Sequence, residues 1–171
     1  GVLPPKWGLG FWQRVPTLFK DSDVEREVFE FKERDYPLSV IGLEPGWMSR
    51  SYPCTYQWDQ TRFPQPDAFV RSMESKGIKI NVWMNPGISP ECDIVEAIEP
   101  YTGTHTEWNG LLPDYSMQEA RAIMKGHLEK NLIDKGVSGF KMDENDGYDY
   151  WVAPDVAIYP SGKTGEQLRQ V

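Results

Sequence analysis

Cysteine is scarce in this sequence, with Cys54 and Cys92 as its two representatives. Two cysteines do not make a disulfide framework, and neither has metal-ligand spacing or an obvious base beside it. We expect both to be incidental to function. No set of His, Cys and Asp has structural zinc spacing, and no Gly-x-Ser-x-Gly elbow is present. The two histidines, His105 and His127, are expected to be surface or packing residues.

Positive charge is also in deficit. The 171 residues contain 18 Lys and Arg against 26 Asp and Glu, which gives a formal net charge of −8. Nucleic acids and anionic membranes are bound through clustered Lys and Arg, so this balance argues against both as partners. No apolar run approaches the ~20 residues of a membrane span. The first residues, GVLPPKWG, lack the apolar region of a secretory signal. The sequence does not predict a cellular compartment.

Aromatic residues, by contrast, are abundant. They make up 13% of the chain and include seven Trp. Aromatic side chains build cores, and they also form the walls of carbohydrate and small-molecule pockets. The composition therefore favours a pocket-bearing globular domain over a nucleic-acid-binding one.

Short apolar runs alternate with amphipathic stretches along the chain. The runs predict strands at residues 7–13, 38–43, 78–83 and 137–142. The run LSVIGL shows no alternation, which is typical of a strand buried on both faces. Between the strands, periodic apolar residues with capping and stop signals predict three helices. Their markers are a capping box at Ser22 and Glu25, a C-terminal Gly77 after residues 67–75, and a second capping box at Ser116 and Glu119 with a stop at Gly136.

The resulting β-α-β-α-β-α-β order implies parallel strands joined by right-handed crossovers. Candidate functional residues follow directly after the strands, where a (β/α)8 barrel carries its active site. A flavodoxin-like open sheet is the competing fold, and it also binds ligands at the carboxyl ends of its strands. No Gly-rich phosphate loop follows the first strand, which argues against nucleotide binding. The candidate functional residues at the ends of the predicted strands are Gln13, Glu44 to Trp47, Trp83 to Asn85 and Asp143 to Asp146.

A complete (β/α)8 barrel needs about 250 residues. Four βα steps use most of this chain, so we predict an α/β fold in which residues 1–171 form one partial domain, the first half of a TIM barrel. A half-barrel leaves open strand edges and an uncovered apolar face, with Val40, Ile80 and Phe140 among the residues expected there. Such edges invite further pairing, so we expect self-association of an isolated copy.

The fourth strand carries the strongest chemical signal. Lys141 and Asp143 are two residues apart and should point to the same side of the strand, with Glu144 and Asp146 close behind. A nearby ammonium keeps a carboxylate ionised, and an ionised, positioned Asp is the nucleophile that a retaining glycosidase needs. The alternative interpretation is a solvated acidic turn after the strand.

The second and third strands end in residues suited to sugars. Glu44 can accept hydrogen bonds from two hydroxyl groups, and the indoles of Trp47 and Trp83 can stack on the C–H face of a sugar. The alternatives are a loop Glu beside a packing Trp and, for Trp83, an indole that fills the barrel mouth. Asp114 precedes a helix N-terminus and is expected to be structural.

Four stretches of the chain together resemble glycoside hydrolase family 31, the retaining α-glycosidases. PPKWGLGFWQ is similar to the beginning of the family's catalytic barrel, and PLSVIGLEPGWM to its second strand with the sugar-binding carboxylate. GIKINVWMNPGIS resembles the third strand and loop. LPDYSMQEARAIMKGHLEKNLIDKGVSGFKMDEND resembles the helix and fourth strand that deliver the nucleophile.

The resemblance implies a role for each matching residue. Asp143 becomes the nucleophile, and Lys141 places the chain near the α-xylosidases, sulfoquinovosidases and some α-galactosidases. Glu44 stands where the family commonly has Asp, so galactose-type sugars remain candidate substrates. The segment Glu144 to Asp146 departs from the usual Phe-Gly-Glu. The implied substrate-binding residues are Glu44, Trp47, Trp83, Lys141 and Asp146.

The family's general acid/base is an Asp that lies well after the fourth strand, and nothing after Asp143 here matches it. The resemblance therefore implies a fragment of a larger enzyme that is inactive alone. The full enzyme would act on α-xylosides, α-glucosides or α-galactosides through a covalent glycosyl-Asp intermediate. The partner is then a carbohydrate, and neither a cofactor nor a metal is implied.

Three other readings of the same residues stay open. Lys141 could form a Schiff base in an aldolase-like lyase. Glu44, Asp143 and Asp146 could surround Mg²⁺ in a metal-dependent barrel enzyme. A catalytically dead barrel could bind sugar without hydrolysing it.

Overall fold

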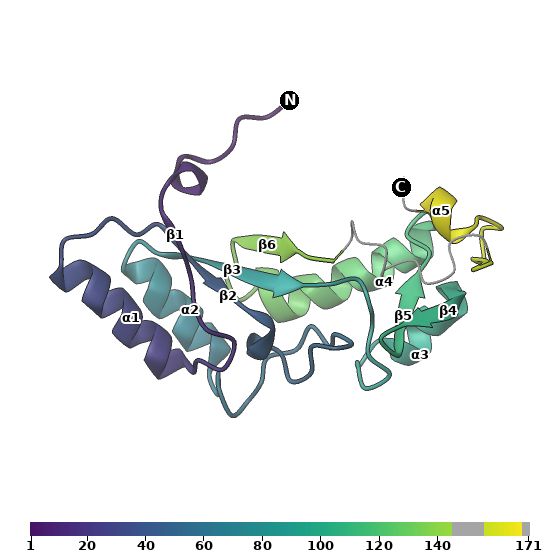
Figure 1. Cartoon of the computed structure of the whole chain (residues 1–171), viewed down its shortest axis with the longest axis horizontal. Helices are drawn as coiled ribbons and strands as arrows, with labels where there is room; N and C mark the ends of the chain where they lie inside the picture. Colours follow the sequence, from purple (N-terminus) through teal and green to yellow (C-terminus); the bar gives the residue numbers. More distant parts are fainter. Residues whose placement is uncertain (145–155, 169–171) are drawn as a thin grey trace.

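The computed structural model describes residues 1–144 and 156–168 of the chain. At its centre lies a four-stranded sheet in the order β1-β2-β3-β6 (Figure 1). All three strand pairings are parallel, as the sequence predicts. The strands are β1 (Trp12–Arg14), β2 (Val40–Leu43), β3 (Lys79–Met84) and β6 (Gly139–Met142).

Three main helices connect these strands and lie on one side of the sheet (Figure 1). They are α1 (Asp21–Glu33), α2 (Pro66–Ser75) and α4 (Gln118–Leu128), the last continued by a π-helical turn, Glu129–Ile133. The strands lie side by side in chain order with these helices on one side, which confirms the predicted part of a (β/α)8 barrel, because a flavodoxin-like sheet reverses its strand order and has helices on both faces. In the described part of the chain, no helix has the length and apolar content needed to cross a bilayer.

The first strand is shorter than predicted. It pairs with β2 only from Trp12 opposite Val40 to Arg14 opposite Gly42. Upstream of Trp12, the carbonyl of Phe11 still accepts the backbone N–H groups of Ser39 and Val40, but Lys6–Leu9 form a 3-10 helix on a segment that projects from the body (Figure 1). Apolar and aromatic character alone therefore overestimated the length of this strand.

The predicted start of α1 is also wrong. The helix begins one residue before Ser22, and the side chain of Asp23 accepts a hydrogen bond from the backbone N–H of Lys20 at 3.1 Å. The predicted stops are confirmed, because Gly77 and Gly136 adopt φ angles of 79° and 98° after their helices. Glycine reaches this left-handed region without the steric cost that a Cβ imposes.

Asp114 anchors the segment before α4, whereas the capping box predicted at Ser116 does not form. Its Oδ1 accepts hydrogen bonds from the backbone N–H of Ser116 at 3.1 Å and from the Ser116 hydroxyl at 2.6 Å, and its Oδ2 accepts one from the N–H of Ser161 at 3.0 Å. Burial raises the pKa of Asp114, but the hydrogen bonds from the two serines outweigh it and lower the pKa. Because Ser116 binds Asp114, it does not cap α4, which begins two residues later at Gln118.

The long segment after β3, for which the sequence patterns predict no strand and only the later helix, holds further secondary structure. It contains the short helix α3 (Val95–Ile98), the 3-10 helix Glu99–Tyr101 and an antiparallel hairpin of β4 (Thr102–Glu107) and β5 (Gly110–Pro113). The hairpin turn at Trp108 and Asn109 has φ angles of 46° and 63°, the positive values that two-residue hairpin turns favour. The polar strand THTE lacks the apolar alternation that predicts strands, which is why the hairpin was missed. Beyond it lies α5 (Gly165–Leu168).

The hydrophobic core fills the space between the sheet and its helices. Ile80 belongs to this core and is 1% exposed, and Val40 is fully buried, so the prediction that both lie uncovered is wrong. Phe140 is 37% exposed and lines a groove beside α4. Ile80 pairs with Ile41 on the helix-covered side of the sheet, whereas the next residue, Asn81, faces the opposite side.

Candidate active site

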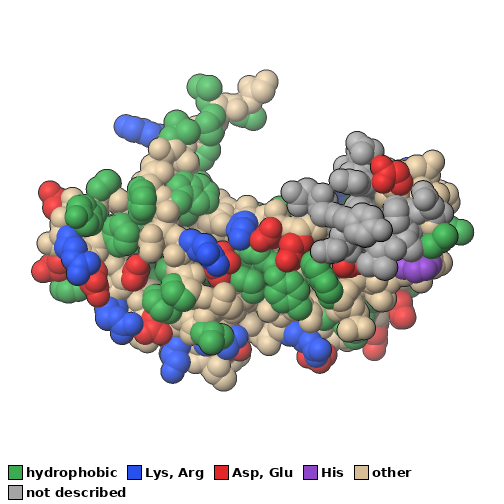
Figure 2. Space-filling model, in the orientation of Figure 1, with side chains coloured by type: hydrophobic (Ala, Val, Ile, Leu, Met, Phe, Trp, Pro, Cys, Tyr) green, Lys and Arg blue, Asp and Glu red, His purple; other side chains and the backbone are tan. Residues whose placement is uncertain are grey.

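Four side chains meet at the carboxyl end of the sheet. Arg14 ends β1, Glu44 follows β2, and Lys141 and Asp143 lie at the end of β6. Because all four strands are parallel, their carboxyl ends share one edge of the sheet. Ion pairs join Arg14 to Glu44, and Lys141 to both Glu44 and Asp143. Figure 2 shows basic and acidic side chains next to each other in the middle of the view.

The carboxylate of Asp143 is held by three hydrogen-bond donors. The indole N–H of Trp83 donates to Oδ2 at 2.7 Å, and the ammonium of Lys141 lies 3.0 Å from the same oxygen. The backbone N–H of Glu144 donates to Oδ1 at 3.0 Å. The Trp83 hydrogen bond is the largest influence, and with Lys141 it lowers the pKa of Asp143 against the opposing effect of burial. The carboxylate is therefore ionised at neutral pH.

Lys141 bridges two carboxylates. Its Nζ lies 3.0 Å from Oδ2 of Asp143 and 3.4 Å from Oε1 of Glu44. Burial lowers the pKa of Lys141, but the two carboxylates outweigh it and raise the pKa. The side chain is consequently a fixed ammonium that links the second strand to the fourth.

Glu44 is buried, and its side chain is 8% exposed. Its Oε1 accepts contacts from two cations, Nε of Arg14 at 3.1 Å and Nζ of Lys141 at 3.4 Å. Two cations compensate the desolvation of this carboxylate, which alone would be costly. A hollow of about 390 Å³ opens beside it, and its polar lining includes Arg14, Glu44, Asn81 and Lys141.

Arg14 and Asn81 were not predicted as site residues. Asn81 is 5% exposed and stands within the apolar run IKINVW, where a lone polar residue is the signal that could have revealed it. No such signal marks Arg14, because the adjacent polar residue Gln13 fits the end of the predicted strand equally well. The side chain of Gln13 instead donates to Oε1 of Glu27 on α1 at 2.9 Å, away from the site.

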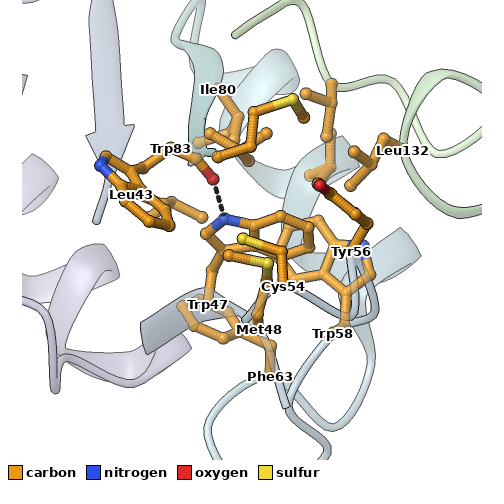
Figure 3. Close-up of a cluster of buried hydrophobic side chains, with 14 of the residues drawn as sticks. Leu43, Trp47, Met48, Cys54, Tyr56, Trp58, Phe63, Ile80, Trp83 and Leu132 are labelled. Atoms are coloured by element: carbon orange, nitrogen blue, oxygen red, sulfur yellow. Dashed lines mark hydrogen bonds between the residues drawn. The ribbon is translucent and has the colours of Figure 1, made fainter. Parts of the chain in front are cut away.

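Trp47 does not face the hollow, which corrects the expectation that it stacks on a sugar. It is 1% exposed, its indole N–H donates to the backbone carbonyl of Trp83 at 2.7 Å, and its ring meets that of Trp58 edge-on with centroids 5.1 Å apart (Figure 3). Trp83 is likewise 1% exposed, so the expectation that its indole stacks on a sugar is corrected too. Trp47 thus supports the strand end from within the core, and Trp83 uses its polar edge to hold Asp143.

A second set of residues lies around Glu144. The Tyr52 hydroxyl donates to its Oε1 at 3.2 Å, and Nδ2 of Asn85 donates to its Oε2 at 3.3 Å. The Tyr52 ring contacts those of Trp83 and Trp108, with centroids 5.3 and 5.4 Å away. Burial and then the charge of Glu144 raise the pKa of Tyr52 to about 12, so its hydroxyl is a donor. The sequence pattern places Glu144 close behind Asp143 in the chain and does not single out Tyr52.

The cysteines and His127 are buried behind this set. Cys54 and Cys92 are free thiols, and burial raises the pKa of both, that of Cys54 to about 12. Such thiols are poor nucleophiles because the reactive form is the thiolate. His127 is 6% exposed and lies 3.6 Å from the sulfur of Cys92. His127 is therefore a packing residue within the core.

Asp146, predicted to bind substrate or Mg²⁺, lies outside the described residues. Among the residues that the structure does describe, no three His, Cys, Asp or Glu side chains gather closely enough to hold a metal ion.

Comparison with known proteins identifies the barrel. Residues 1–165 match the family model described as "Glycosyl hydrolases family 31 TIM-barrel domain", and the chain belongs to this family. It is 29% identical over 156 residues to α-xylosidase XylQ of Lactiplantibacillus pentosus, covering 82% of this chain and 20% of that protein. It is 27% identical over 159 residues to α-glucosidase 2 of Bacillus thermoamyloliquefaciens, covering 84% and 20%. The chain thus spans about a fifth of the length of these relatives.

Solved structures support the same fold. A family 31 α-xylosidase from a soil metagenome, complexed with xylose, superposes with a TM-score of 0.82 at 20% identity, over 96% of this chain and 26% of that one. The Flavobacterium johnsoniae dextranase complexed with glucose gives a TM-score of 0.81 at 22% identity, over 98% and 22%. These structures confirm that the chain corresponds to part of a TIM barrel.

Proposed function

We propose that this chain is the nucleophile-bearing part of a retaining α-glycosidase and that Asp143 is the nucleophile. The observation that carries the proposal is an ionised carboxylate at the end of β6, held by Trp83 and Lys141. A carboxylate in this state can attack an anomeric carbon and stabilise the oxocarbenium-like transition state.

The reaction proceeds by double displacement. Asp143 forms a bond to the anomeric carbon as the bond to the leaving oxygen breaks, and water then hydrolyses the glycosyl-Asp ester with net retention. The leaving oxygen takes its proton from a second carboxyl group about 5–5.5 Å from the nucleophile. In this proposal that acid/base belongs to the longer protein of which the chain is a fragment.

Glu44 and Lys141 line the hollow and are proposed to bind sugar hydroxyls, together with Asp146. Trp83 acts through Asp143, which it holds. α-Xylosides and α-glucosides are the first substrates to test, because similar proteins bear those names. α-Galactosides belong in the same panel, because the family commonly has Asp where this chain has Glu44.

Two alternatives to a retaining glycosidase, a Schiff-base lyase and a sugar-binding barrel, predict different experimental results. A Schiff-base lysine must be an uncharged amine, and the raised pKa of Lys141 opposes that role. A sugar-binding barrel without hydrolysis would bind the same ligands and turn none of them over. Borohydride trapping with a carbonyl substrate tests the first alternative, and turnover by the full-length protein tests the second.

The decisive experiment is labelling of the full-length protein with mechanism-based fluoroglycosides of xylose, glucose and galactose, followed by peptide mapping. The expected result is one sugar on Asp143, and loss of labelling in Asp143→Ala. Labelling of any other residue would overturn the assignment. The isolated 171-residue chain is expected to be inactive on aryl α-glycosides.

A further inference from the structure

Glu144 has a backbone conformation that its residue type rarely adopts. Its φ angle is 61°, in the left-handed region, where the Cβ of an ordinary residue clashes with the backbone. In this conformation its N–H donates to Oδ1 of Asp143 at 3.0 Å. The strained residue therefore directly contacts the proposed nucleophile.

Both carboxylate oxygens of Glu144 have a donor that fixes this conformation. The Tyr52 hydroxyl binds Oε1 at 3.2 Å, and Nδ2 of Asn85 binds Oε2 at 3.3 Å. Asn85 is 1% exposed, and its own Oδ1 accepts hydrogen bonds from the Gly87 N–H and the Cys54 thiol, each at 3.1 Å. A buried, doubly bound amide is a rigid anchor, so the Glu144 side chain is held from the core.

The two oxygens of Asp143 are not equivalent. Oδ2 receives the Trp83 indole N–H at 2.7 Å and the Lys141 ammonium at 3.0 Å. Oδ1 receives the Glu144 N–H at 3.0 Å. In a glycosyl ester the non-bridging oxygen becomes a carbonyl and still accepts hydrogen bonds, which suits Oδ2. The less heavily bound oxygen, Oδ1, is then the one available for bond formation.

We propose that Glu144 is a positioning residue for the nucleophile, whose left-handed backbone sets the rotation of the Asp143 carboxylate so that Oδ1 bonds to the sugar. This rests on the proposed function. As the Oδ1–carbon bond forms, the bond from the anomeric carbon to the leaving group breaks, and the leaving oxygen takes its proton from the acid/base that the longer protein supplies in this proposal. Tyr52 and Asn85 act indirectly, because they hold Glu144, which in turn contacts Asp143.

The test compares Glu144→Gly with Glu144→Val in the full-length protein. Both variants lose the carboxylate, but only glycine accepts a positive φ without strain. We expect labelling of Asp143 by the fluoroglycoside to be about tenfold slower in the valine variant than in the glycine variant. The acid limb of kcat/KM should also move slightly to higher pH in Glu144→Val alone, because there the backbone N–H of residue 144, one of the groups that lower the pKa of Asp143, no longer donates to Oδ1.

A second pair of variants keeps the test decisive if Glu144→Val does not fold. Tyr52→Phe removes one donor to Glu144 and should slow labelling several-fold, whereas Tyr36→Phe, at a distant exposed tyrosine, should not. Equal labelling rates in Glu144→Gly and Glu144→Val overturn the proposal, as does a wild-type rate in Tyr52→Phe. A wild-type protein labelled elsewhere than Asp143 instead defeats the proposed function itself.

The trapped intermediate gives an independent outcome. In a crystal structure of the labelled full-length protein, the sugar should be bonded to Oδ1, with Oδ2 still within hydrogen-bond distance of the Trp83 indole. A sugar bonded to Oδ2 would overturn the assignment of the two oxygens.

Discussion

The indole nitrogen of Trp83 lies 2.7 Å from Oδ2 of Asp143, which joins the third strand of the sheet to the fourth. The contact has two effects at once. It fixes the carboxylate in place, and it is the largest cause of the lowered pKa of Asp143. Trp83 in turn receives the Trp47 indole N–H on its backbone carbonyl, so the core directly supports the proposed nucleophile (Figure 3).

Neighbouring carboxylates should differ sharply in their importance. Asp143→Asn removes the nucleophile while keeping its shape, and we expect the turnover of the full-length protein to fall by roughly 10³-fold or more. Glu144→Gln keeps the backbone and one acceptor for Tyr52 or Asn85, so it should retain far more activity. Steady-state kinetics on aryl α-glycosides measure both. An Asp143→Asn variant with most of the wild-type rate would contradict the proposed chemistry.

Lys141 should set the acid side of the pH profile. The nucleophile must be ionised, and Lys141 helps to lower the pKa of Asp143. Lys141→Met therefore raises that pKa and shifts the acid limb of kcat/KM to higher pH. Lys135→Met is a matched control, because Lys135 lies 2.7 Å from Asp67 and lowers its pKa far from the site. A control profile that shifts equally would show that the effect is not local to Asp143.

Trp47 should matter for stability rather than for substrate binding. Trp47→Phe leaves the buried carbonyl of Trp83 without its donor, and we expect a loss of about 1–3 kcal/mol in the free energy of unfolding. Urea denaturation followed by circular dichroism measures it, with Trp108→Phe, at a 37% exposed position, as the control. A large rise in KM at unchanged stability would instead restore the sugar-stacking role.

Glu44 should influence both affinity and sugar preference. Glu44→Gln replaces the charged acceptor of hydrogen bonds from sugar hydroxyls by a neutral amide, and we expect kcat/KM to fall by about 10–100-fold. Glu44→Asp withdraws the carboxylate by one methylene and should favour xylosides or glucosides over galactosides. Ratios of kcat/KM across the three sugars provide the readout. Glu91→Gln, in the exposed pair with Arg50, is the control and should change none of them.

The isolated chain should associate with itself. β1 and β6 are the edges of the sheet, and Trp12, Phe140 and Met142 on them are 43%, 37% and 57% exposed. Burial of each large apolar side chain contributes about 1.5–3 kcal/mol, a large share of the roughly 5–15 kcal/mol that stabilises a domain. Sedimentation velocity should show concentration-dependent oligomers or aggregates. A dilute monomer with cooperative melting would contradict this prediction.

Local patterns in the sequence were enough to predict four parallel strands and the meeting of Glu44, Lys141 and Asp143. These properties follow from local signals: apolar runs, helix stops such as Gly77, and the two-residue alternation that puts Lys141 and Asp143 on one side. The carboxyl ends of parallel strands must share an edge, so residues that follow the strands come together without further information.

Which strand residues face the helices depends on contacts between segments far apart in the chain. Ile80 and Asn81 differ by one position, and the register with β2, together with the helices on one face, placed the first in the core and the second at the hollow. Trp47 and Glu144 show the same limit. Whether the indole of Trp47 stacks on a ligand or fills a core depends on its neighbours in space. The left-handed backbone of Glu144 likewise depends on the contacts with Tyr52 and Asn85 that hold its side chain.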